Sequence, residues 1–386
     1  MKLSEICEVN PKGLVLDSNT NVSFVAMPDV SEDGKISTSD IRKYHEVKKG
    51  YTSFIDGDVL LAKITPCMEN GKGALATGLI NGIGFGSTEF HVLRPLYGKA
   101  DGKWLYYFTV WPGFRKDAER NMTGSAGQKR VPKDFLEKYD LFVPPLEMQR
   151  LQVQQLDSIK GLIDLRKSQL SYCDHLIKAR FVEMFGTYPA NEKDWPTGAI
   201  RDLVTDVRYG SSRKAAEGDS GRYPYLRMNN ITYGGELDLT DVKTIDIPEE
   251  ELDKCSVRYG DLLFNRTNSK ELVGKTCVYN REELMVLAGF VVRVRLNEKA
   301  LPEFVSAFLN SDFSKKMLLG MCKAAIGQAN INAQELQSIG IYIPPLDMQK
   351  TFVEFVAQIN KTKSVIQKSL DETQILFDSL MHRYFG

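Results

Sequence analysis

The chain has 386 residues and carries 50 Lys and Arg against 50 Asp and Glu, so its formal net charge is zero. This length permits two or more hydrophobic cores, and the balanced charge restricts any basic, nucleic-acid-binding surface to local patches. Six scattered cysteines without a CxxC pair favour free thiols, and the lack of a signal-peptide core or a membrane-length apolar run predicts a cytoplasmic protein without membrane contact.

Residues 1–143 are typical of a mixed, strand-rich domain. The apolar run Val59–Ile64 follows a Gly-Asp turn and predicts a short buried strand. Trp104–Val110 predicts a helix with aromatic and aliphatic faces. Basic and amide side chains gather near turns of this domain, where Arg and Lys suit guanine edges and phosphates and Gln suits adenine. These candidate DNA-binding residues are Lys63, Thr65, Lys72, Gln128, Lys129 and Arg130.

Residues 144–186 form the first of two predicted helical spacers. Pro144 and Pro145 stand where a helix begins, and Gly186 stands where a glycine stop is expected. The segment between them predicts a helix of about 55 Å at 1.5 Å per residue. A seven-residue step of apolar positions predicts a coiled-coil seam, and the nearly balanced charges argue against a phosphate-binding stripe. The seam residues are Leu156, Ile163, Leu170 and Ile177.

Residues 187–343 predict a second strand-rich domain. Asp261–Arg266 and Phe290–Arg295 are typical of strands, and Pro302–Leu309 of a helix. The second spacer, residues 344–386, has its own seam at Val356, Ile366, Leu370 and Phe377. Candidate DNA-binding residues in this domain are Arg208, Arg213, Lys214, Arg227, Asn229, Asn230, Arg266, Asn268 and Lys270. Any one of them alone is more often an ordinary surface residue, but as a set on duplicated loops they favour recognition.

The second half of the chain repeats the first at a distance of 200 residues. Leu141–Gln149 corresponds to Ile341–Gln349, and Gly127-Gln128 to Gly327-Gln328. The repeat weakens towards the start of each half, where Phe90 pairs with Phe290 and the Gly57-Asp58 turn with Gly260-Asp261. This period is too long for a repeat array and indicates a duplicated module. The decrease in similarity towards the start of each half is explained if the two scaffolds have stayed alike while the two recognition surfaces have diverged.

The defects in the two seams predict that the helices pair with each other. Arg166 and Arg180 occupy positions where the second helix has Ile366 and Leu380, while Lys363 stands at the position of Ile163. The order helix, module, helix then favours antiparallel packing, with the two modules at opposite ends of a rod.

Catalytic motifs are missing from the sequence. Gly82, Gly84 and Gly86 do not have G-x-G-x-x-G spacing, and no phosphate loop or nucleophile elbow is present. An adenine methyltransferase would need an Asn/Asp-Pro-Pro-aromatic motif, which neither Pro-Pro pair supplies. The four histidines are isolated, so no metal site is predicted. The sequence predicts a protein that is not an enzyme.

Two variable modules, each followed by an apolar-Pro-Pro-Leu-Glu/Asp-Met-Gln entry into a long helix, resemble the specificity (S) subunit of type I restriction–modification enzymes. The resemblance covers essentially the whole chain. It implies an α+β fold of two target recognition domains and two helices in an antiparallel coiled coil, with internal pseudo-twofold symmetry. Each domain would read one half of a split double-stranded DNA target.

The same resemblance implies partners that carry the chemistry. Modification subunits, two in number, would bind S-adenosylmethionine and methylate adenine, and restriction subunits would use ATP and Mg, with no cofactor on this chain. Two alternatives remain open at this point: a methyltransferase with a fused recognition domain, and a coiled-coil adaptor that does not bind DNA.

Overall fold

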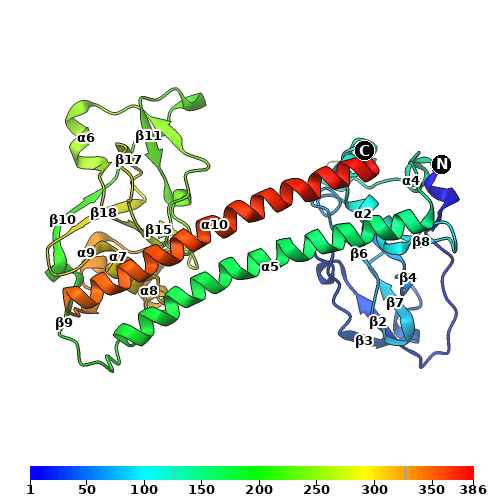
Figure 1. Ribbon diagram of the computed structural model, residues 1–386, viewed down its shortest axis with the longest axis horizontal. Coiled ribbons are helices and arrows are strands. Elements are labelled where there is room, and N and C mark those ends of the chain that lie inside the picture. Colours follow the sequence, from blue (N-terminus) through cyan, green and yellow to red (C-terminus); the bar gives the residue numbers. More distant parts are fainter. Residues whose placement is uncertain (126, 326–327) are drawn as a thin grey trace. The chain divides into compact units, whose positions relative to one another are not determined.

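A computed structural model describes residues 1–125, 127–325 and 328–386, and it divides into two compact units (Figure 1). Unit 1 consists of Met1–Lys167 together with Lys368–Gly386, and unit 2 of Ser168–Gln367. Helix α5 (Leu146–Phe185) begins in unit 1 and ends in unit 2, whereas α10 (Leu346–Phe385) begins in unit 2 and ends in unit 1. Both 40-residue helices were predicted, and each unit therefore contains the start of one and the end of the other.

Unit 1 contains two four-stranded sheets. The first is antiparallel, in the order β1 (Cys7–Val9), β8 (Phe90–Pro95), β5 (Val59–Ala62) and β6 (Gly73–Leu75). The second has the order β3 (Asp40–Lys43), β2 (Asn21–Val25), β7 (Ile83–Gly86) and β4 (Thr52–Ile55). In this second sheet β2 and β7 run parallel and the other neighbours antiparallel.

Unit 2 repeats both sheets in the same strand order. Its first sheet is β10 (Val204–Tyr209), β18 (Val291–Leu296), β14 (Leu262–Asn265) and β16 (Thr276–Val278), and its second is β12 (Lys243–Ile245), β11 (Tyr223–Leu226), β17 (Met285–Leu287) and β13 (Ser256–Val257). Again the second and third strands of the second sheet, β11 and β17, are parallel. The duplication therefore includes the topology of the divergent part of each module.

The register corrects one predicted equivalence. Phe90 lies opposite Ala62 at the start of β8, and Val291 lies opposite Asn265 at the start of β18. Phe90 therefore corresponds to Val291, and the predicted match with Phe290 is wrong by one residue. Matching only the apolar residues at the start of each strand does not place the small gap, whereas the pairing of Arg94 with Arg295 at the strand ends has the correct register.

Two smaller sheets occur in unit 2. Strand β9 (Thr197–Ala199) pairs with β21 (Gly340–Tyr342), and β20 (Gln328–Asn330) lies between β15 (Thr267–Asn268) and β19 (Lys323–Ala325). In unit 1 the equivalent contacts are isolated bridges, which join Lys2 to Asp140 and Ile64 to Arg130. The backbone paths match, although the pairing in unit 1 is shorter.

Short helices complete each unit and confirm the predicted helices near residues 104 and 302. Unit 1 has α1 (Tyr44–Val47), α2 (Gly102–Val110), α3 (Pro112–Arg120) and α4 (Lys133–Lys138). Unit 2 has α6 (Glu249–Cys255), α7 (Pro302–Asn310), α8 (Asp312–Met321) and α9 (Ala333–Gln337). Equivalent 3-10 turns are η1 (Leu3–Glu5) with η4 (Ile200–Leu203), and η2 (Met27–Asp29) with η6 (Met228–Asn230).

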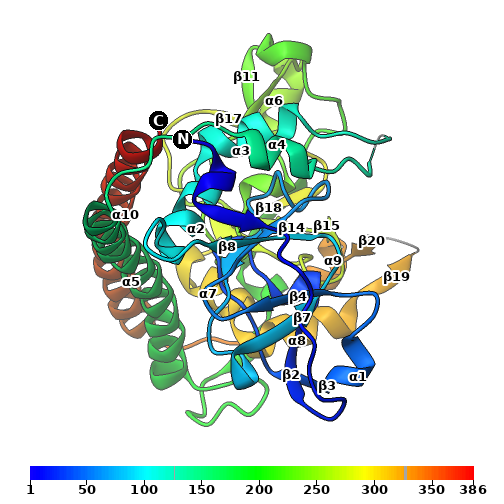
Figure 2. The same ribbon diagram turned by 90° about the vertical axis from the view of Figure 1, so that its right-hand side faces the viewer.

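The core of each unit includes residues of both long helices. In unit 1, Trp104 from α2 is fully buried with Leu156 of α5 and Met381 of α10, and Figure 2 views this unit with both helices beside it. In unit 2, the rings of Phe181 (α5) and Phe352 (α10) lie 5.4 Å apart in the core. The end of each helix lies beside the start of the other, so within each unit the two helices are antiparallel.

The predicted seam residues lie on the inward side of the helices. Leu156, Ile163 and Leu370 are buried, and Leu170, Ile177, Val356, Ile366 and Phe377 are half-buried. Lys363, the predicted defect, places its ammonium group 2.7 Å from Asp174 and 2.5 Å from Glu236. A charge in the seam is therefore compensated by carboxylates from α5 and from a neighbouring turn.

The glutamine of each helix entry is completely buried. The Gln149 side-chain oxygen accepts a hydrogen bond from the Asp101 N–H at 2.8 Å, and its amide nitrogen donates to the carbonyls of Lys99 and Pro144 at 3.0 and 2.9 Å. Gln349 makes the same three bonds, to Leu301, Lys299 and Pro344. The Pro-Pro-Leu-x-Met-Gln motif is thus a clip that fixes the first turn of each long helix to its module.

The Gly-Asp turn is a second structural feature that occurs in both units with equivalent hydrogen bonds. Gly57 has φ +93° and Gly260 φ +85°, a left-handed conformation that favours glycine. Asp58, which follows, is buried and accepts hydrogen bonds from the Ile55 N–H and from Arg94, whose guanidinium lies 2.7 Å away. Asp261 accepts in the same way from the Arg258 N–H and from Arg295. The adjacent carboxylate raises the pKa of each of these arginines.

Candidate nucleic-acid interface

In unit 1 the segment that leaves β5 lies beside the segment that precedes α4. The Thr65 N–H donates to the Lys129 carbonyl at 3.1 Å, and the Val131 N–H donates to the Lys63 carbonyl at 2.9 Å. The structure thus brings together five candidates from two distant stretches of sequence, and we call residues 63–65 and 128–130 the first edge. Gln128 and Lys129 are exposed at this edge, while Lys63 and Thr65 are half-buried.

Unit 2 builds the same edge from equivalent segments. Residues 267 and 268 of β15 pair with 330 and 329 of β20, and the Ile331 N–H donates to the Arg266 carbonyl at 2.9 Å. We call residues 266–268 and 328–330 the second edge. Gly327, which belongs to the repeated Gly-Gln dipeptide, lies outside the described residues.

Side chains differ at matching backbone positions of the two edges. The first edge carries a two-bond ion pair between Arg130 and Glu89 at 2.9 and 2.8 Å, and these hydrogen bonds hold the pKa of Glu89 below its usual value. In the second edge the residue at the position of Glu89 is Phe290, which is 50% exposed. There the Arg266 guanidinium lies 4.9 Å from the centre of the Tyr209 ring and donates to the Gly289 carbonyl.

Two candidates of the first module have structural partners. The Thr65 hydroxyl donates to Glu69 at 2.8 Å, and the Lys72 ammonium donates to the carbonyl of Met27 at 3.2 Å. Lys275 makes the equivalent bond to Met228 at 2.9 Å and is buried. Both lysines connect the first sheet to the 3-10 turn of the second sheet. The signal for Lys275 was present, since Gly71-Lys72 and Gly274-Lys275 are repeated dipeptides.

Three arginines of the second module form ion pairs in which at least one partner is exposed. Arg208 pairs with Asp206 at 2.9 Å, Arg213 with Glu251 at 2.7 Å, and Arg227 with Asp241 at 2.8 Å. The Arg213–Glu251 pair is exposed on both sides, and such a pair contributes little to stability, so Arg213 can exchange its carboxylate for a phosphate at small cost. These arginines lie outside the second edge as defined above.

The remaining candidates of the second module divide by exposure. Lys214, Asn229 and Lys270 are exposed, and the half-buried Asn268 accepts from the Ser269 N–H. Asn230 is only 2% exposed, and its amide donates to the carbonyls of Asp238 and Asp241 while accepting from the Arg227 N–H. Asn230 therefore shapes a turn, and Asn229 is the neighbour that faces solvent.

Lysines from the long helices hold an outer turn of each module, a role that the sequence analysis missed. Lys160 of α5 donates to the Asp33 carbonyl at 2.8 Å, and Lys363 of α10 contacts Glu236. Burial lowers the pKa of Lys160. Gly34 at this turn packs so closely on Tyr106 that a Cβ would clash with the phenol oxygen. No spacing in the sequence indicates these long-range contacts.

Within residues 1–125, 127–325 and 328–386, no cluster of His, Cys, Asp and Glu could hold a metal ion. Over the same ranges, no helix has the length and apolar character needed to cross a membrane.

Comparison with known proteins identifies the family. The sequence matches the Type I restriction modification DNA specificity domain over residues 1–171 and again over 192–373. The chain belongs to this family. The resemblance predicted from the duplicated helix entries is confirmed, and so is the α+β fold with two strand-rich modules and two long packed helices.

Curated relatives carry the corresponding names. The type I restriction enzyme EcoEI specificity subunit of Escherichia coli is 28% identical over an alignment that covers 98% of this chain and 81% of the relative. The EcoAI specificity subunit of Escherichia coli is 44% identical, over 43% of this chain and 28% of the relative.

Solved structures agree with the fold. A chain from a structure of type I restriction–modification complex assembly aligns with TM-score 0.62 and 17% identity, over 100% of this chain and 96% of its own length. The S subunit of a type I system from M. genitalium aligns with TM-score 0.54 and 12% identity, over 100% of this chain and 95% of its own.

Proposed function

We infer that each module of this specificity subunit reads one half of a split double-stranded DNA target. The observation that carries this proposal is the edge that occurs once in each module with the same backbone pairing and different side chains. DNA is read by side chains that vary on a constant frame, because base edges differ while the groove shape is shared. Residues 63–65 with 128–130 would contact one half-site, and residues 266–268 with 328–330 the other.

The candidate side chains divide into two groups by their surroundings. Lys63, Gln128, Lys129, Arg266 and Asn268 lie on the edges and are proposed to contact bases or nearby phosphates. Seven further candidates are proposed phosphate contacts. In two of them, Arg213 and Arg227, the arginine holds an exposed carboxylate that DNA can replace. The seven are Arg130, Arg208, Arg213, Lys214, Arg227, Asn229 and Lys270. Lys72, Thr65 and Asn230 are proposed to support the loops, because their polar groups already bind within the protein.

The chain is proposed to act without catalytic chemistry of its own. It would direct adenine methylation and restriction by partner subunits, with S-adenosylmethionine on the modification subunits and ATP and Mg on the restriction subunits. Such a complex would work in the cytoplasm, where the DNA is.

The long helices are proposed to bind two modification subunits and to set the gap between the half-sites. Leu151, Leu162 and Leu165 on α5 are 46 to 55% exposed, and Ile375 and Leu376 on α10 are 69% and 50% exposed. Apolar side chains exposed in number on one element are typical of a protein interface. Forty residues at 1.5 Å each give each helix a length of about 60 Å. Target recognition domains at 1–143 and 187–343 and spacers at 144–186 and 344–386 remain the proposed division.

A binding series at varied salt tests this function. The complex of this chain with its modification subunits is titrated against duplexes that carry the methylated sequence, each half-site scrambled in turn, or both. We expect affinity to fall when either half-site is scrambled, with a steep salt dependence from phosphate contacts. If the chain adds no affinity or sequence preference to the modification subunits at any salt concentration, the protein is a coiled-coil adaptor and the proposal is wrong.

A further inference from the structure

The second edge has an exposed phenylalanine beside it where the first edge has a carboxylate. Phe290 is 50% exposed. The Arg266 N–H donates to the Phe290 carbonyl at 3.0 Å, just as the Lys63 N–H donates to the Glu89 carbonyl at 2.9 Å. Phe290 and Glu89 therefore occupy equivalent positions, and each lies beside a residue that is proposed to contact DNA.

The register of the first sheet of unit 2 brings the side chains of Arg266 and Phe290 to the same side. Asn265 pairs with Val291 in the antiparallel ladder of β14 and β18, so Arg266 and Phe290 are the next opposite residues beyond it. Directly opposite residues of an antiparallel pair have Cβ atoms about 5 Å apart. Successive base pairs of DNA follow each other at about 3.4 Å, so two side chains this close can contact neighbouring base pairs.

The Arg266 side chain is held in one direction by its surroundings. Its guanidinium lies 4.9 Å from the centre of the Tyr209 ring, and it donates to the Gly289 carbonyl at 3.3 Å. The Tyr209 hydroxyl in turn accepts from the Ala333 N–H at 3.0 Å, which fixes the ring under the arginine. A guanidinium oriented in this way suits the two acceptors on the major-groove edge of guanine, and Phe290 then lies next to the contacted base.

The Phe290 ring is not part of the packing of unit 2. Its neighbours in the chain, Ala288 and Val291, are buried members of hydrophobic clusters. Among the residues that the structure describes, Phe290 itself belongs to no such cluster. Its apolar surface is removed from water only when another molecule covers it, so the ring is available for binding.

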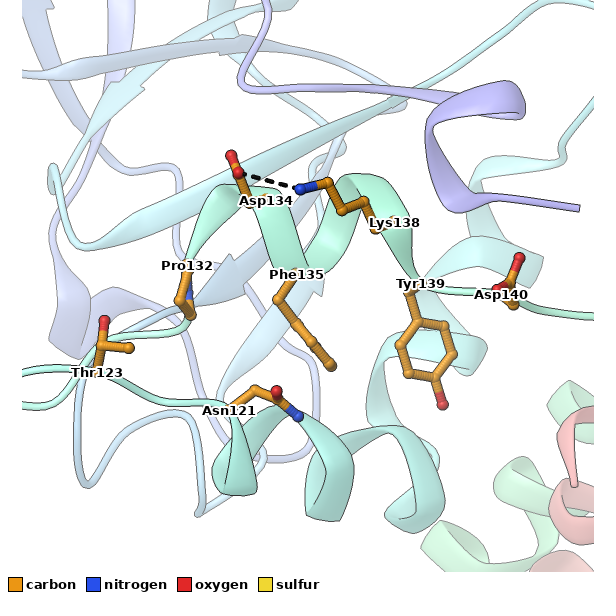
Figure 3. A pocket seen from close by; sticks show the side chains of 8 residues that line it. All are labelled: Asn121, Thr123, Pro132, Asp134, Phe135, Lys138, Tyr139 and Asp140. Carbon is orange, nitrogen blue, oxygen red and sulfur yellow. Dashed lines mark hydrogen bonds and ion pairs between the residues drawn. The ribbon is translucent and has the colours of Figure 1, made fainter.

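Near the first edge, by contrast, an aromatic side chain packs within unit 1. Thr123 and Arg130 exchange two backbone hydrogen bonds of 3.0 and 2.8 Å, and Thr123 lines a pocket of about 580 Å³ (Figure 3). The ring of Phe135 in this pocket lies 5.5 Å from that of Tyr139 and 6.4 Å from that of Phe114. Phe135 therefore belongs to an aromatic cluster, and it does not take the place of Phe290 in the first module.

We propose that Phe290 contacts the C5-methyl group of a thymine next to the base that Arg266 contacts. This inference rests on the proposed function, in which the second edge contacts one half-site. Among the four bases, thymine alone presents a methyl group in the major groove, and phenylalanine is one of the side chains that suit it. The carboxylate of Glu89 at the equivalent position suits the amino group of cytosine instead. Phe290 is thus a residue that determines specificity in the second module alone.

Replacement of thymine by uracil tests the contact, because deoxyuridine keeps the base pair and lacks only the methyl group. The complex of this chain with its modification subunits is titrated against duplexes in which each thymine of the half-site of the second module, on either strand, is replaced in turn. We expect affinity to fall about fourfold at one position, the effect of burying one methyl-sized group. The Phe290→Ser complex should bind the thymine and uracil duplexes equally, whereas Phe290→Leu should keep part of the preference for thymine.

Leu284→Ser is the matched control and should keep the full preference for thymine. Leu284 is 45% exposed in the same module and lies at the opposite end of β17 from Phe290. Because the two duplexes are compared within each variant, a general loss of affinity cancels.

Three results would overturn the proposal. The natural complex binds every uracil duplex as tightly as the thymine duplex, or the half-site contains no thymine on either strand. The preference for thymine persists in Phe290→Ser. Phe290→Ser weakens binding of the modification subunits in the absence of DNA, which would show that a protein covers the ring. Scrambling the whole half-site distinguishes these results from a failure of the proposed function: if scrambling weakens binding, the second module reads DNA and only the role of Phe290 is wrong, whereas binding that is insensitive to scrambling contradicts both.

Discussion

The two recognition modules differ at their exposed edges and agree at two sets of buried hydrogen bonds, those of the helix-entry glutamine and of the Gly-Asp turn. Gln149 and Gln349 make three equivalent hydrogen bonds each. Asp58 and Asp261 each accept hydrogen bonds from an arginine at the equivalent position, although the surrounding sequences have diverged. At the edges, an ion pair of Arg130 with Glu89 contrasts with an exposed Phe290 beside Arg266. Replacing these glutamines or aspartates would leave their buried partners unsatisfied, whereas the edge residues can change at small cost. The duplicated glutamine and aspartate contacts therefore hold the same scaffold in both modules, and the edge residues on that scaffold can vary.

The largest expected effect is the loss of the buried aspartate. Asp58→Ala leaves the Arg94 guanidinium and the Ile55 N–H without their acceptor, and we expect a loss of about 3 kcal/mol in the free energy of unfolding. Asp261→Ala should cost a similar amount, which denaturant titration measures. Asp134→Ala is the control, because this carboxylate is 77% exposed and pairs only with Lys138. If only one of the two substitutions lowers the free energy of unfolding strongly, the two Gly-Asp turns are not equivalent.

The glutamine clip gives the next effect. Gln149→Ala or Gln349→Ala leaves one N–H and two carbonyls of the helix entry without a partner, which predicts a loss of about 2–4 kcal/mol. Hydrogen exchange should accelerate in the first turn of α5 or α10, respectively, and not in the other helix. Gln154→Ala, an exposed change on α5, is the matched control and should leave both helix entries protected.

The sequence predicted the long helices and the central strands because the signals for these elements are local or repeated. Pro-Pro with a following Gly stop predicted both long helices, and the Gly-Asp turns predicted β5 and β14. The edges were predicted only as scattered residues, because the contact of residues 63–65 with 128–130 depends on tertiary packing. Asn230 and Lys72 have the residue types of DNA contacts, and only burial and partners show that they hold the structure.

Substitutions at the two edges test whether each edge contributes to the recognition of a different half-site. Lys63→Ala and Arg266→Ala should each weaken DNA binding by the complex by about 1–3 kcal/mol, because each removes a proposed direct contact. Each variant should lose discrimination at only one half-site, and at opposite ones. Lys368→Ala, on the exposed face of α10, is the control and should keep both preferences. Loss of discrimination at both half-sites from a single edge substitution would contradict independent reading.

The smallest expected effect is a pH dependence confined to the first module. His91 is buried, its Nε2–H donates to the Val131 carbonyl at 2.8 Å and its Nδ1 accepts from the Asn10 side-chain amide at 3.0 Å, and burial lowers its pKa. The equivalent residue in the second module is Val292. Below about pH 6.5, His91 of the unfolded chain binds a proton, whereas the buried His91 of the folded chain does not. The free energy of unfolding therefore falls as the pH falls, by up to about 1.4 kcal/mol per pH unit, until the pH reaches the pKa of the folded state.

Comparison with His91→Val isolates this contribution. The free energy of unfolding, measured between pH 7.5 and 5.5, should fall more steeply in the natural chain than in the variant. The exposed histidines remain in both proteins and cancel. Identical slopes would show that burial does not lower the pKa of His91 in the folded protein.

Exchange of one module tests whether each module reads one half of the DNA target. Residues 187–343 are replaced by the corresponding module of another family member, and the methylated DNA sequence is determined in cells that contain the modification subunits. Because each edge belongs to one module, one half of the methylated sequence should change while the other half and its position remain. If both halves change together, or if neither changes in a folded and methylating complex, the assignment of one half-site to each module is wrong.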